Sequence, residues 1–346
     1  MRGVVYAGVG RVRVADLPEP ELEADDDAII RVTASAVCGS DLHFFHGKAP
    51  LDPGEPMGHE AVGVVETVGS AVARVVPGDR VVVAFTVACG ACWFCERGQT
   101  ALCDEAAIFG TGLFGGELPG AQAERLRVPH GDVNLLPIPT GVDDELALFA
   151  GDVATTALYA ASLAAPKPGD TVAVVGAGPL GLLTIQALVA PADHRVVALD
   201  RDATRLGLAE ASGATPVHVA ERHPQMALAD LTGDRGADIA IDAVGSPAAF
   251  ATAVDIVRRG GAVLVAGMYA GETVDLQLGT YWVRGLDVRF TGVCPVHAYW
   301  RRTMAELEAG RLDPLPLVSH RLTLEDAPHG YELFDRREAT KVLFLQ

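Results

Sequence analysis

The sequence contains few basic residues. Among its 346 residues there are 27 lysines and arginines against 45 aspartates and glutamates, which gives a formal net charge of -18. A protein that binds nucleic acid needs lysines and arginines to neutralise phosphates. We therefore expect no nucleic acid partner and interpret the acidity as a solvated surface.

Long apolar runs are also scarce. The first residues contain no extended apolar segment of the kind that an export signal needs. Residues 171–192 carry no charge and are numerous enough to cross a bilayer, but glycines and a proline interrupt them. We interpret this stretch as a buried strand and a separate helix, and expect no membrane partner. The predicted location is the cytoplasm, where cysteines stay reduced.

Only six cysteines are present, yet four of them are close together, at Cys89, Cys92, Cys95 and Cys103. The short gaps let successive thiolates surround one ion, and the fourth sulfur leaves no open position for chemistry. The alternatives are a disulfide cluster or a redox Cys-x-x-Cys pair. Because the spacing is that of metal ligands and no export signal precedes it, we predict a structural zinc site.

The length allows two sizeable cores, and the two halves of the sequence differ in pattern. The first half contains short β-type segments between turn residues, which predicts a strand-rich, barrel-like domain. These segments are 3–6, 28–34, 63–68, 80–84 and 122–128. The second half alternates apolar strands with helix-like segments, which predicts a doubly wound parallel sheet. The strands are 171–175, 195–199, 239–242 and 262–266, and the helices are 180–189, 205–211 and 248–258.

A glycine fingerprint follows the first of these parallel strands. Gly176 would permit a tight turn, Gly178 would let the backbone approach a pyrophosphate, and Gly181 would let helix and sheet pack closely. Pro179 and Leu180 open the helix, whose N-terminus favours negative charge. The pattern predicts a dinucleotide site.

Asp200 ends the second parallel strand, where a carboxylate can accept hydrogen bonds from ribose hydroxyls. It would repel a 2′-phosphate, so the sequence favours NAD over NADP. The neighbouring Arg201 could instead turn toward such a phosphate, which leaves NADP possible, or it could be an ordinary exposed arginine.

A second group of metal-ligand residue types occurs early in the chain, at Cys38, His59 and Glu60. Taken singly, Cys38 could be a small buried apolar residue and His59 a histidine satisfied within the core. The other motifs in the chain make a functional role for these residues the better interpretation. In order along the chain, Cys-Gly-Ser-Asp-x-His, Gly-His-Glu, the four-cysteine segment, the glycine fingerprint and the ribose aspartate all occur.

This combination resembles the zinc-containing medium-chain dehydrogenase/reductase family, of the alcohol dehydrogenase type, over essentially the whole length. The resemblance implies a GroES-like catalytic domain at 1–153, completed by 295–346, and a Rossmann domain at 154–294. It also implies two zinc ions per chain, one catalytic and one structural, and assembly into a homodimer or homotetramer.

The resemblance implies Cys38 and His59 as ligands of the catalytic zinc, with Glu60 as an alternative or outer ligand. Many relatives have a cysteine as the third ligand, but this chain has Asp152 at that position, and the aspartate resembles the glutathione-independent formaldehyde dehydrogenase-like branch. It could instead cap the helix that follows, since aspartate favours that position. The chain shows no obvious counterpart of the extended loop with which that branch encloses NAD.

Further roles are implied by the same resemblance. Ser40 would accept the alcohol proton and pass it, through the cofactor ribose, to His43; their alternatives are a turn-capping serine and a surface histidine. Asp41 would hydrogen-bond His59. Lys341 would contact the pyrophosphate, unless it is simply solvated. Phe85 would line the substrate pocket, unless it belongs to the core. Other aromatics expected to add to an apolar wall are Phe45, Trp93, Phe114 and Trp282.

The expected activity is hydride transfer between a nicotinamide cofactor and a small uncharged alcohol, aldehyde or ketone, because no basic cluster near the motifs indicates a charged substrate. The alternatives are a polyol or sugar dehydrogenase, and a nucleotide-binding protein without turnover on the same fold. The serine and histidine of the relay and the set of ligands argue against the last alternative.

Overall fold

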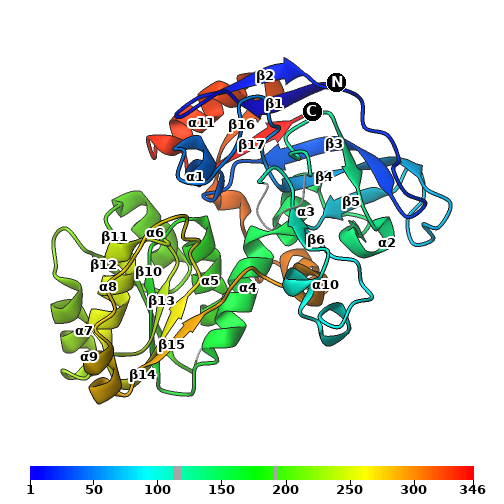
Figure 1. Cartoon of the computed structure of the whole chain (residues 1–346). Helices are drawn as coiled ribbons and strands as arrows, with labels where there is room; N and C mark the ends of the chain where they lie inside the picture. The colour runs from blue at the N-terminus through cyan, green and yellow to red at the C-terminus, as the bar shows by residue number, and fades with distance from the viewer. Residues whose placement is uncertain (112–117, 191–192) are drawn as a thin grey trace. The chain divides into compact units, whose positions relative to one another are not determined.

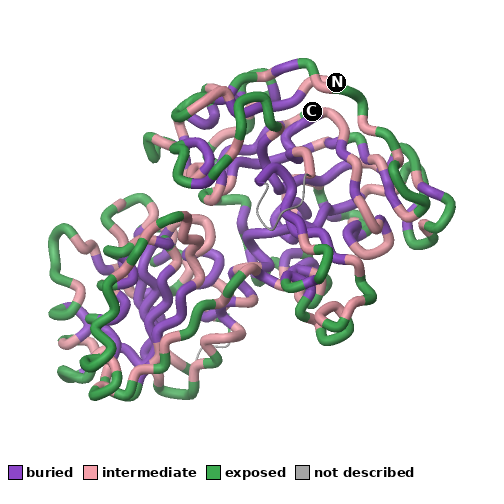
Figure 2. The backbone as a smooth tube through the Cα atoms, viewed as in Figure 1, coloured by how far each residue is buried: buried purple, intermediate pink, exposed green. Residues whose placement is uncertain are grey.

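The computed structural model describes residues 1–111, 118–190 and 193–346 (Figure 1). Its contacts divide the chain into two compact units. Unit 1 comprises residues 1–155, 294–310 and 314–346, and unit 2 comprises residues 156–293 and 311–313. Each unit has its own buried interior (Figure 2).

Unit 1 contains a seven-stranded sheet in which six strands follow the order β16-β17-β3-β4-β5-β9 and β8 pairs with β3. All pairs are antiparallel except β16 with β17. The strands are β3 (Ala28–Ala36), β4 (Glu60–Val68), β5 (Arg80–Val83), β8 (Arg125–Val128), β9 (Leu135–Pro137), β16 (Val318–Thr323) and β17 (Lys341–Leu345). Two small sheets pair β1 (Arg2–Tyr6) with β2 (Val12–Asp16), and β6 (Thr86–Val87) with β7 (Ala107–Ile108).

Alternating side chains explain why β3 lies at the centre of this sheet. Ile30 and Val32 are buried while Arg31 between them is exposed, as expected of a strand with one face in a core. Ile30 and Val32 belong to the same apolar cluster as Val65 and Leu126, which come from the neighbouring strands β4 and β8.

Short helical segments surround the sheet of unit 1. The α-helices are α1 (Asp41–Phe45), α2 (Gly131–Asn134), α3 (Asp144–Ala147), α10 (Val296–Glu308) and α11 (Ala327–Asp335). The 3₁₀ turns are η1 (Cys95–Arg97), η2 (Thr100–Leu102), η4 (Leu148–Gly151), η5 (Leu315–Leu317) and η6 (Leu324–Asp326). Helix α4 (Val153–Ala164) begins in unit 1 and continues in unit 2.

Unit 2 is a six-stranded parallel sheet with the order β12-β11-β10-β13-β14-β15. Its strands are β10 (Thr171–Val175), β11 (Arg195–Asp200), β12 (Thr215–His218), β13 (Ala237–Asp242), β14 (Val257–Val265) and β15 (Asp287–Phe290). The helices are α5 (Pro179–Val189), α6 (Ala203–Ala211), α7 (Pro224–Thr232), α8 (Pro247–Ile256) and α9 (Leu278–Arg284). Helices lie on both faces of the sheet, with α5 on one and α7 and α8 on the other (Figure 1).

The predicted fold class, a β-rich domain and a doubly wound parallel sheet, is confirmed. The structure differs from the prediction in detail at residues 257–258, which begin β14 rather than end the preceding helix. Within the described ranges, no single helix is long and apolar enough to cross a membrane. One pair of segments, Asp144–Gly151 and Val153–Ala164, meets the length and composition conditions together but bends by 49°.

Candidate functional site

Three separate segments of unit 1 supply the first group of ligand-type side chains. Cys38 lies in the turn after β3, and His59 directly precedes β4. Because Ala36 of β3 pairs with Glu60 of β4, both residues lie at the same end of this strand pair. Asp152 lies in the single-residue break between η4 and α4.

The side chains of Cys38, His59, Glu60 and Asp152 meet, with one ligand atom from each lying within 4.8 Å of the others. The Asp152 Oδ2 atom is 3.7 Å from Cys38 Sγ and 3.2 Å from His59 Nε2. The carboxylate of Asp152 is thus turned toward the other two predicted ligands. A thiolate, an imidazole and a carboxylate form a donor set that suits zinc.

The electrostatics of this cluster favour a cation. Burial raises the pKa of the Cys38 thiol, and the negative charges of Asp152 and Glu60 raise it further. Burial also raises the pKa of Glu60, whose Oε1 atom is buried without a hydrogen-bond partner. A divalent ion would stabilise the deprotonated thiol and carboxylates together, so the residues fit a metal ion.

Asp41 lies beside the ring nitrogen of His59 that faces away from the cluster. Its Oδ1 atom is 3.2 Å from His59 Nδ1, while its Oδ2 accepts the Cys38 backbone N–H at 2.9 Å. Burial alone would lower the pKa of His59, but the Asp41 charge and the hydrogen bonds to Asp152 and Asp41 raise it well above its usual range. This placement leaves Nε2 directed at Asp152 and Cys38.

Lys341, which the sequence predicts to be a pyrophosphate contact or a solvated lysine, is buried beside the cluster and not solvated. Its side chain is only 1% exposed, and Nζ donates to Glu60 Oε2 at 2.5 Å, inside unit 1. Burial would lower the pKa of this lysine, but the Glu60 charge and the other acidic groups of the cluster raise it. The observed partner is therefore a carboxylate beside the metal-ligand cluster.

The two predicted relay residues belong to the start of α1. Ser40 precedes the helix without a side-chain capping bond, and its Oγ lies 3.3 Å from His59 Nε2, beside the cluster. His43 follows one turn later, and its backbone N–H donates to the Ser40 carbonyl at 3.1 Å.

Of the predicted pocket aromatics, Phe85 lies near the cluster. It is buried, and its ring centroid is 6.1 Å from that of His59. Phe45 is buried against Tyr331, Trp93 lies under the Arg97 guanidinium, and Trp282 is exposed on α9 of unit 2. Phe114 lies outside the described residues.

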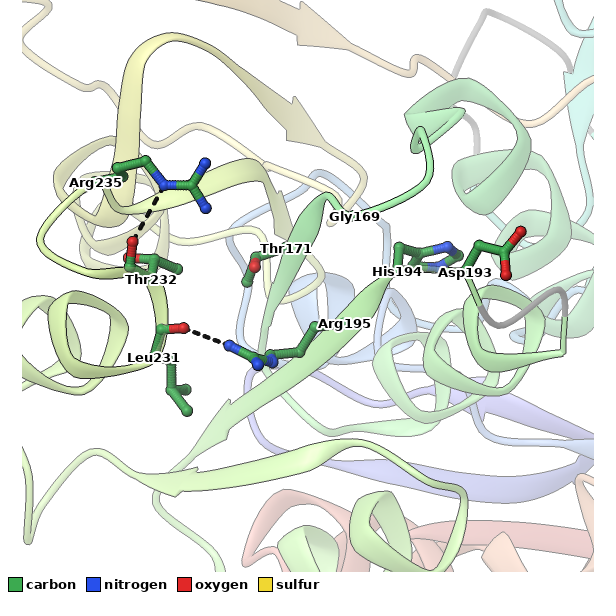
Figure 3. Close-up of a pocket in the computed structure, with 8 residues that line it drawn as sticks. All are labelled: Gly169, Thr171, Asp193, His194, Arg195, Leu231, Thr232 and Arg235. Carbon is green, nitrogen blue, oxygen red and sulfur yellow. Dashed lines mark hydrogen bonds between the residues drawn. The ribbon is translucent and has the colours of Figure 1, made fainter.

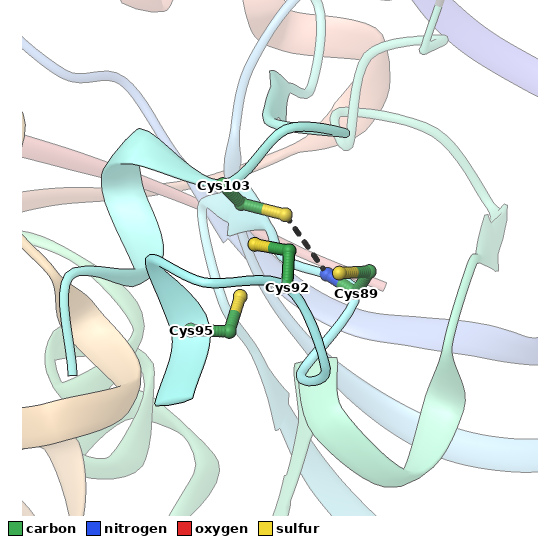
Figure 4. A group of neighbouring side chains, drawn as sticks. All are labelled: Cys89, Cys92, Cys95 and Cys103. Atoms are coloured by element: carbon green, nitrogen blue, oxygen red, sulfur yellow. Dashed lines mark hydrogen bonds between the residues drawn. The ribbon is translucent and has the colours of Figure 1, made fainter. Parts of the chain in front are cut away.

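The four clustered cysteines form a compact lobe between β6 and β7. Their sulfur atoms turn toward a common point and lie within 4.8 Å of one another (Figure 4). All four are thiols rather than disulfides. Backbone N–H groups of Cys89 and Glu105 approach the Cys103 sulfur at 3.2 and 3.3 Å and oppose the rise in its pKa that burial causes.

Neighbouring groups give these thiols different pKa values. Hydrogen bonds from backbone groups of Asp104 and Cys95 lower the pKa of Cys92 to about 6. Burial and the neighbouring Cys92 sulfur raise the pKa of Cys95 to about 12. The lowered pKa favours the thiolate of Cys92, and a metal ion would stabilise the remaining thiolates.

The glycine fingerprint in unit 2 lies at the carboxyl end of β10. Gly176 adopts φ +96°, and Gly181 packs so closely that an added Cβ would lie 1.9 Å from the Gly176 carbonyl oxygen. Gly178 differs, because an added Cβ there would meet nothing within 4 Å. Gly178 precedes Pro179 at the N-terminus of α5 without a side-chain cap, which leaves helix N–H groups for a bound phosphate.

Asp200 is fixed at the adjacent strand end. Its Oδ2 accepts the Ala177 N–H at 2.6 Å, and its Oδ1 accepts the N–H groups of Arg201 and Asp202. The glycine loop and the acidic residue are thus joined directly. Arg201 is exposed.

A pocket of about 680 Å³ in unit 2 lies at the amino ends of the strands, opposite to the glycine loop at their carboxyl ends (Figure 3). Thr171 and Arg195, which begin β10 and β11, line it, and Arg195 and Arg235 donate to the carbonyls of Leu231 and Thr232. Ligands of open α/β sheets bind at the carboxyl ends of the strands. This pocket is therefore separate from the glycine loop.

Two further residues beside Asp41, Gln122 and Tyr331, belong to no motif in the sequence. Both are fully buried: Gln122 Nε2 lies 3.5 Å from Asp41 Oδ2, and the Tyr331 hydroxyl donates to Gln122 Oε1 at 2.9 Å. Only the side-chain contacts reveal them, because an isolated buried glutamine or tyrosine has no spacing signature.

Comparisons with known proteins agree with this geometry. Residues 24–140 match the alcohol dehydrogenase GroES-like domain, and residues 179–309 match the zinc-binding dehydrogenase domain. The chain is 36% identical to the uncharacterized zinc-type alcohol dehydrogenase-like protein AdhB of Bacillus subtilis, with 97% of each chain covered. It is 31% identical to the glutathione-independent formaldehyde dehydrogenase of Pseudomonas aeruginosa, over 96% of this chain and 94% of that protein.

Among solved structures, the alcohol dehydrogenase TADH from Thermus sp. ATN1 is 42% identical and superimposes with a TM-score of 0.95 over the full length of both chains. The chain therefore belongs to the zinc-containing medium-chain dehydrogenase/reductase family, and it is a zinc-dependent oxidoreductase that uses a nicotinamide cofactor.

Proposed function

We propose that the protein oxidises a small uncharged primary or secondary alcohol, or reduces the corresponding aldehyde or ketone, with NAD. The observation that carries this proposal is the meeting of Cys38, His59 and Asp152 from three distant segments. These three residues would hold a catalytic zinc, with Glu60 as an outer or alternative ligand. Such an ion polarises a substrate oxygen and lowers its pKa.

The remaining residues of unit 1 have proposed roles around that ion. Ser40, whose hydroxyl lies beside the His59 ring, would accept the alcohol proton, and His43 would release it to solvent. Phe85 would form an apolar wall of the substrate pocket. The lobe of Cys89, Cys92, Cys95 and Cys103 would hold a structural zinc, because four thiolates leave no open position.

A panel of alcohols and aldehydes, assayed with NAD and NADP beside elemental analysis, tests this proposal. We expect turnover of uncharged alcohols and two zinc ions per chain. Vicinal diols and sugars belong in the panel, since preferential turnover of these would favour the polyol dehydrogenase alternative. If the fully metal-loaded protein turned over none of these substrates, the result would favour the alternative of a nucleotide-binding protein without turnover.

The preference for NAD is proposed from Asp200. The carboxylate is fixed against the glycine loop, where it would repel a 2′-phosphate. Kinetics with both cofactors measure this preference, and a strong preference for NADP would overturn it.

Two glycine variants test the proposed dinucleotide site itself. In Gly178→Ala the new methyl meets no protein atom, so the melting temperature should stay constant while KM for NAD rises by roughly tenfold, about 1.4 kcal/mol. In Gly181→Ala the methyl clashes with the Gly176 carbonyl, so stability should fall as well. An unchanged KM for NAD in Gly178→Ala would exclude close approach of the pyrophosphate to this glycine.

We also propose a homo-oligomer. Leu278, Trp282 and Val283 of α9 and Phe290 of β15 are exposed by 64% or more, and β15 is the last strand of its sheet. A second copy of the chain would cover these apolar side chains. Sedimentation of the wild type and of Trp282→Ser tests this, and a monomeric wild type would contradict it.

A further inference from the structure

A line of buried hydrogen-bonding side chains extends outward from His59 within unit 1. Asp41, Gln122 and Tyr331 are each at most 1% exposed, and they come from the start of α1, the segment before β8, and α11. Buried polar side chains that touch one another over three distant segments need mutual satisfaction. Their partners show what they hold in place.

The contact nearest to His59 is Asp41. One carboxylate oxygen lies 3.2 Å from His59 Nδ1, and the other accepts the Cys38 backbone N–H at 2.9 Å. The same carboxylate therefore touches two of the proposed zinc ligands. Any shift of Asp41 would be transmitted to both.

Gln122 is the next residue of this line. Its Nε2 donates to the Ala36 carbonyl at 2.9 Å and lies 3.5 Å from Asp41 Oδ2, and its Oε1 accepts the Tyr331 hydroxyl at 2.9 Å. A carbonyl can only accept, so the Ala36 oxygen fixes which end of the amide carries the nitrogen. The Tyr331 hydroxyl must then donate to Gln122 Oε1, and Gln122 Nε2 in turn faces Asp41 as a donor.

The backbone beside His59 also packs on Gln122. An added Cβ on Gly58 would lie 2.4 Å from Gln122 Cγ, and the Gly58 carbonyl accepts the Ala121 N–H at 2.8 Å. Gly58 has φ +88°, which glycine adopts without strain. Gln122 thus supports His59 in two ways: it packs against the backbone of the preceding residue, Gly58, and it contacts Asp41.

Tyr331 anchors the outer end of the line. Its ring stacks on Phe45 of α1 at a centroid distance of 5.6 Å and an interplanar angle of 26°. Burial and the nearby Asp41 charge raise the pKa of the Tyr331 phenol well above its usual range, so the hydroxyl keeps its proton. The geometry of the Gln122 amide likewise makes this hydroxyl the donor.

We infer that Gln122 and Tyr331 are positioning residues that, through Asp41, fix the ring orientation and tautomer of His59, with Nε2 available to the metal. This inference rests on the proposed zinc site at Cys38, His59 and Asp152. Outer partners of a metal-binding histidine typically affect metal affinity by about 10- to 100-fold. Gln122 and Tyr331 touch no ligand directly, so they act only through the contacts described above.

Two variants test the inference through metal binding rather than turnover. Tyr331→Phe removes only the hydroxyl and keeps the ring on Phe45, and Gln122→Met removes the amide at similar length. Tyr6→Phe is the matched control, because Tyr6 is a buried tyrosine of the same unit outside this line. Zinc affinity is measured by competition with a chelator, and the ligand geometry by the visible absorption of the cobalt-substituted protein.

We expect Tyr331→Phe to weaken zinc binding at the Cys38 site by about tenfold and Gln122→Met by up to about 100-fold, with altered cobalt absorption. The four-cysteine lobe provides an internal reference, and its zinc affinity should stay unchanged. Tyr6→Phe should behave as the wild type.

Zinc affinity and cobalt absorption in Tyr331→Phe equal to those of Tyr6→Phe would overturn the inference. Parallel loss of zinc from both sites would also overturn it, because that result indicates general destabilisation. A separate measurement addresses the proposed function: if Cys38→Ser retains as much zinc as the wild type, the zinc site itself is refuted. The two failures are therefore distinguishable.

Discussion

In both groups of ligand-type side chains in unit 1, the ligand atoms lie within 4.8 Å of one another, but the two groups come from differently spaced parts of the sequence. The lobe takes four identical thiols from one continuous segment, Cys89 to Cys103. The other group combines a thiol, an imidazole and carboxylates from separate segments, and its first and last members, Cys38 and Asp152, are 114 residues apart. A local group can form with its loop, whereas the assembled group requires the complete sheet of unit 1.

This difference also appears in the surroundings. The lobe is held chiefly by backbone N–H groups, and its cysteines are mostly half-buried. The assembled group lies among buried charges, with Asp41 and Lys341 both 1% exposed. The comparison indicates that damage to the lobe should affect stability first, and that damage to the assembled group should affect chemistry first.

The largest expected effect follows from Cys38→Ser. Loss of the thiolate should lower kcat/KM by more than about 100-fold, beyond what changes around a metal ligand usually cause. Zinc content should fall from two ions to one, with the lobe still loaded. Steady-state kinetics and elemental analysis on folded protein measure this, and turnover equal to that of the wild type would remove Cys38 from the site.

A large change in stability is expected from Lys341→Met. The variant leaves the Glu60 carboxylate buried without its counter-charge, which should reduce the free energy of unfolding by about 3–5 kcal/mol. Urea denaturation at constant zinc measures the loss. Adding Glu60→Gln should recover part of it, and Lys167→Met, an exposed lysine, should change stability by less than about 0.5 kcal/mol. No loss in Lys341→Met would contradict the buried ion pair.

The matching change in the lobe is Cys103→Ser. It removes one of four ligands, so one zinc should be lost and the melting temperature should fall, by about 2–4 °C for each kcal/mol of lost stability. Turnover at low temperature should largely persist, in contrast to Cys38→Ser. Equal loss of turnover in both variants would abolish the distinction between the two groups.

The smallest effect is a pH dependence near the lobe. Burial lowers the pKa of His297 to about 4, and its Nε2 lies 2.8 Å from the oxygen of Asn134, which also accepts the Ala88 N–H beside Cys89. Between pH 6.5 and 4, His297 is protonated in the unfolded chain but neutral in the folded chain, so the free energy of unfolding decreases as the pH falls. The slope from this ring is at most about 1.4 kcal/mol per pH unit.

Urea denaturation at several pH values, compared with His297→Gln, isolates that contribution. The variant should show a flatter dependence between pH 6.5 and 4. Identical slopes would show that His297 is protonated equally in the folded and unfolded chain.

Local patterns made much of this architecture predictable. The glycine fingerprint and the lobe each occupy one continuous segment, and buried strands such as β10 and β13 carry near-continuous apolar residues. The strands β12 and β15 were not predicted, because they lie at the two edges of the sheet and carry polar side chains. An edge strand buries too little surface to require an apolar run.

The candidate site was predictable only where a motif names a residue. Cys38, His59 and Asp152 follow from resemblance, and their side chains do meet. The position of Lys341 was not predictable, since sequence shows a basic residue but not whether a carboxylate lies opposite it. Gln122 and Tyr331 are separated by 209 residues, and no local rule connects them.

Unit 1 surrounds unit 2 in the order of the chain, because residues 294–310 and 314–346 return to it. During synthesis the ribosome delivers β3 early, whereas its neighbour β17 and the helix bearing Tyr331 come out last. Residues 156–293 are continuous and can condense meanwhile. Residues 28–31 of β3 can pair with β8 early, but residues 34–36, which lead into the turn bearing Cys38, lack their strand partner on that side of β3 until β17 has been made.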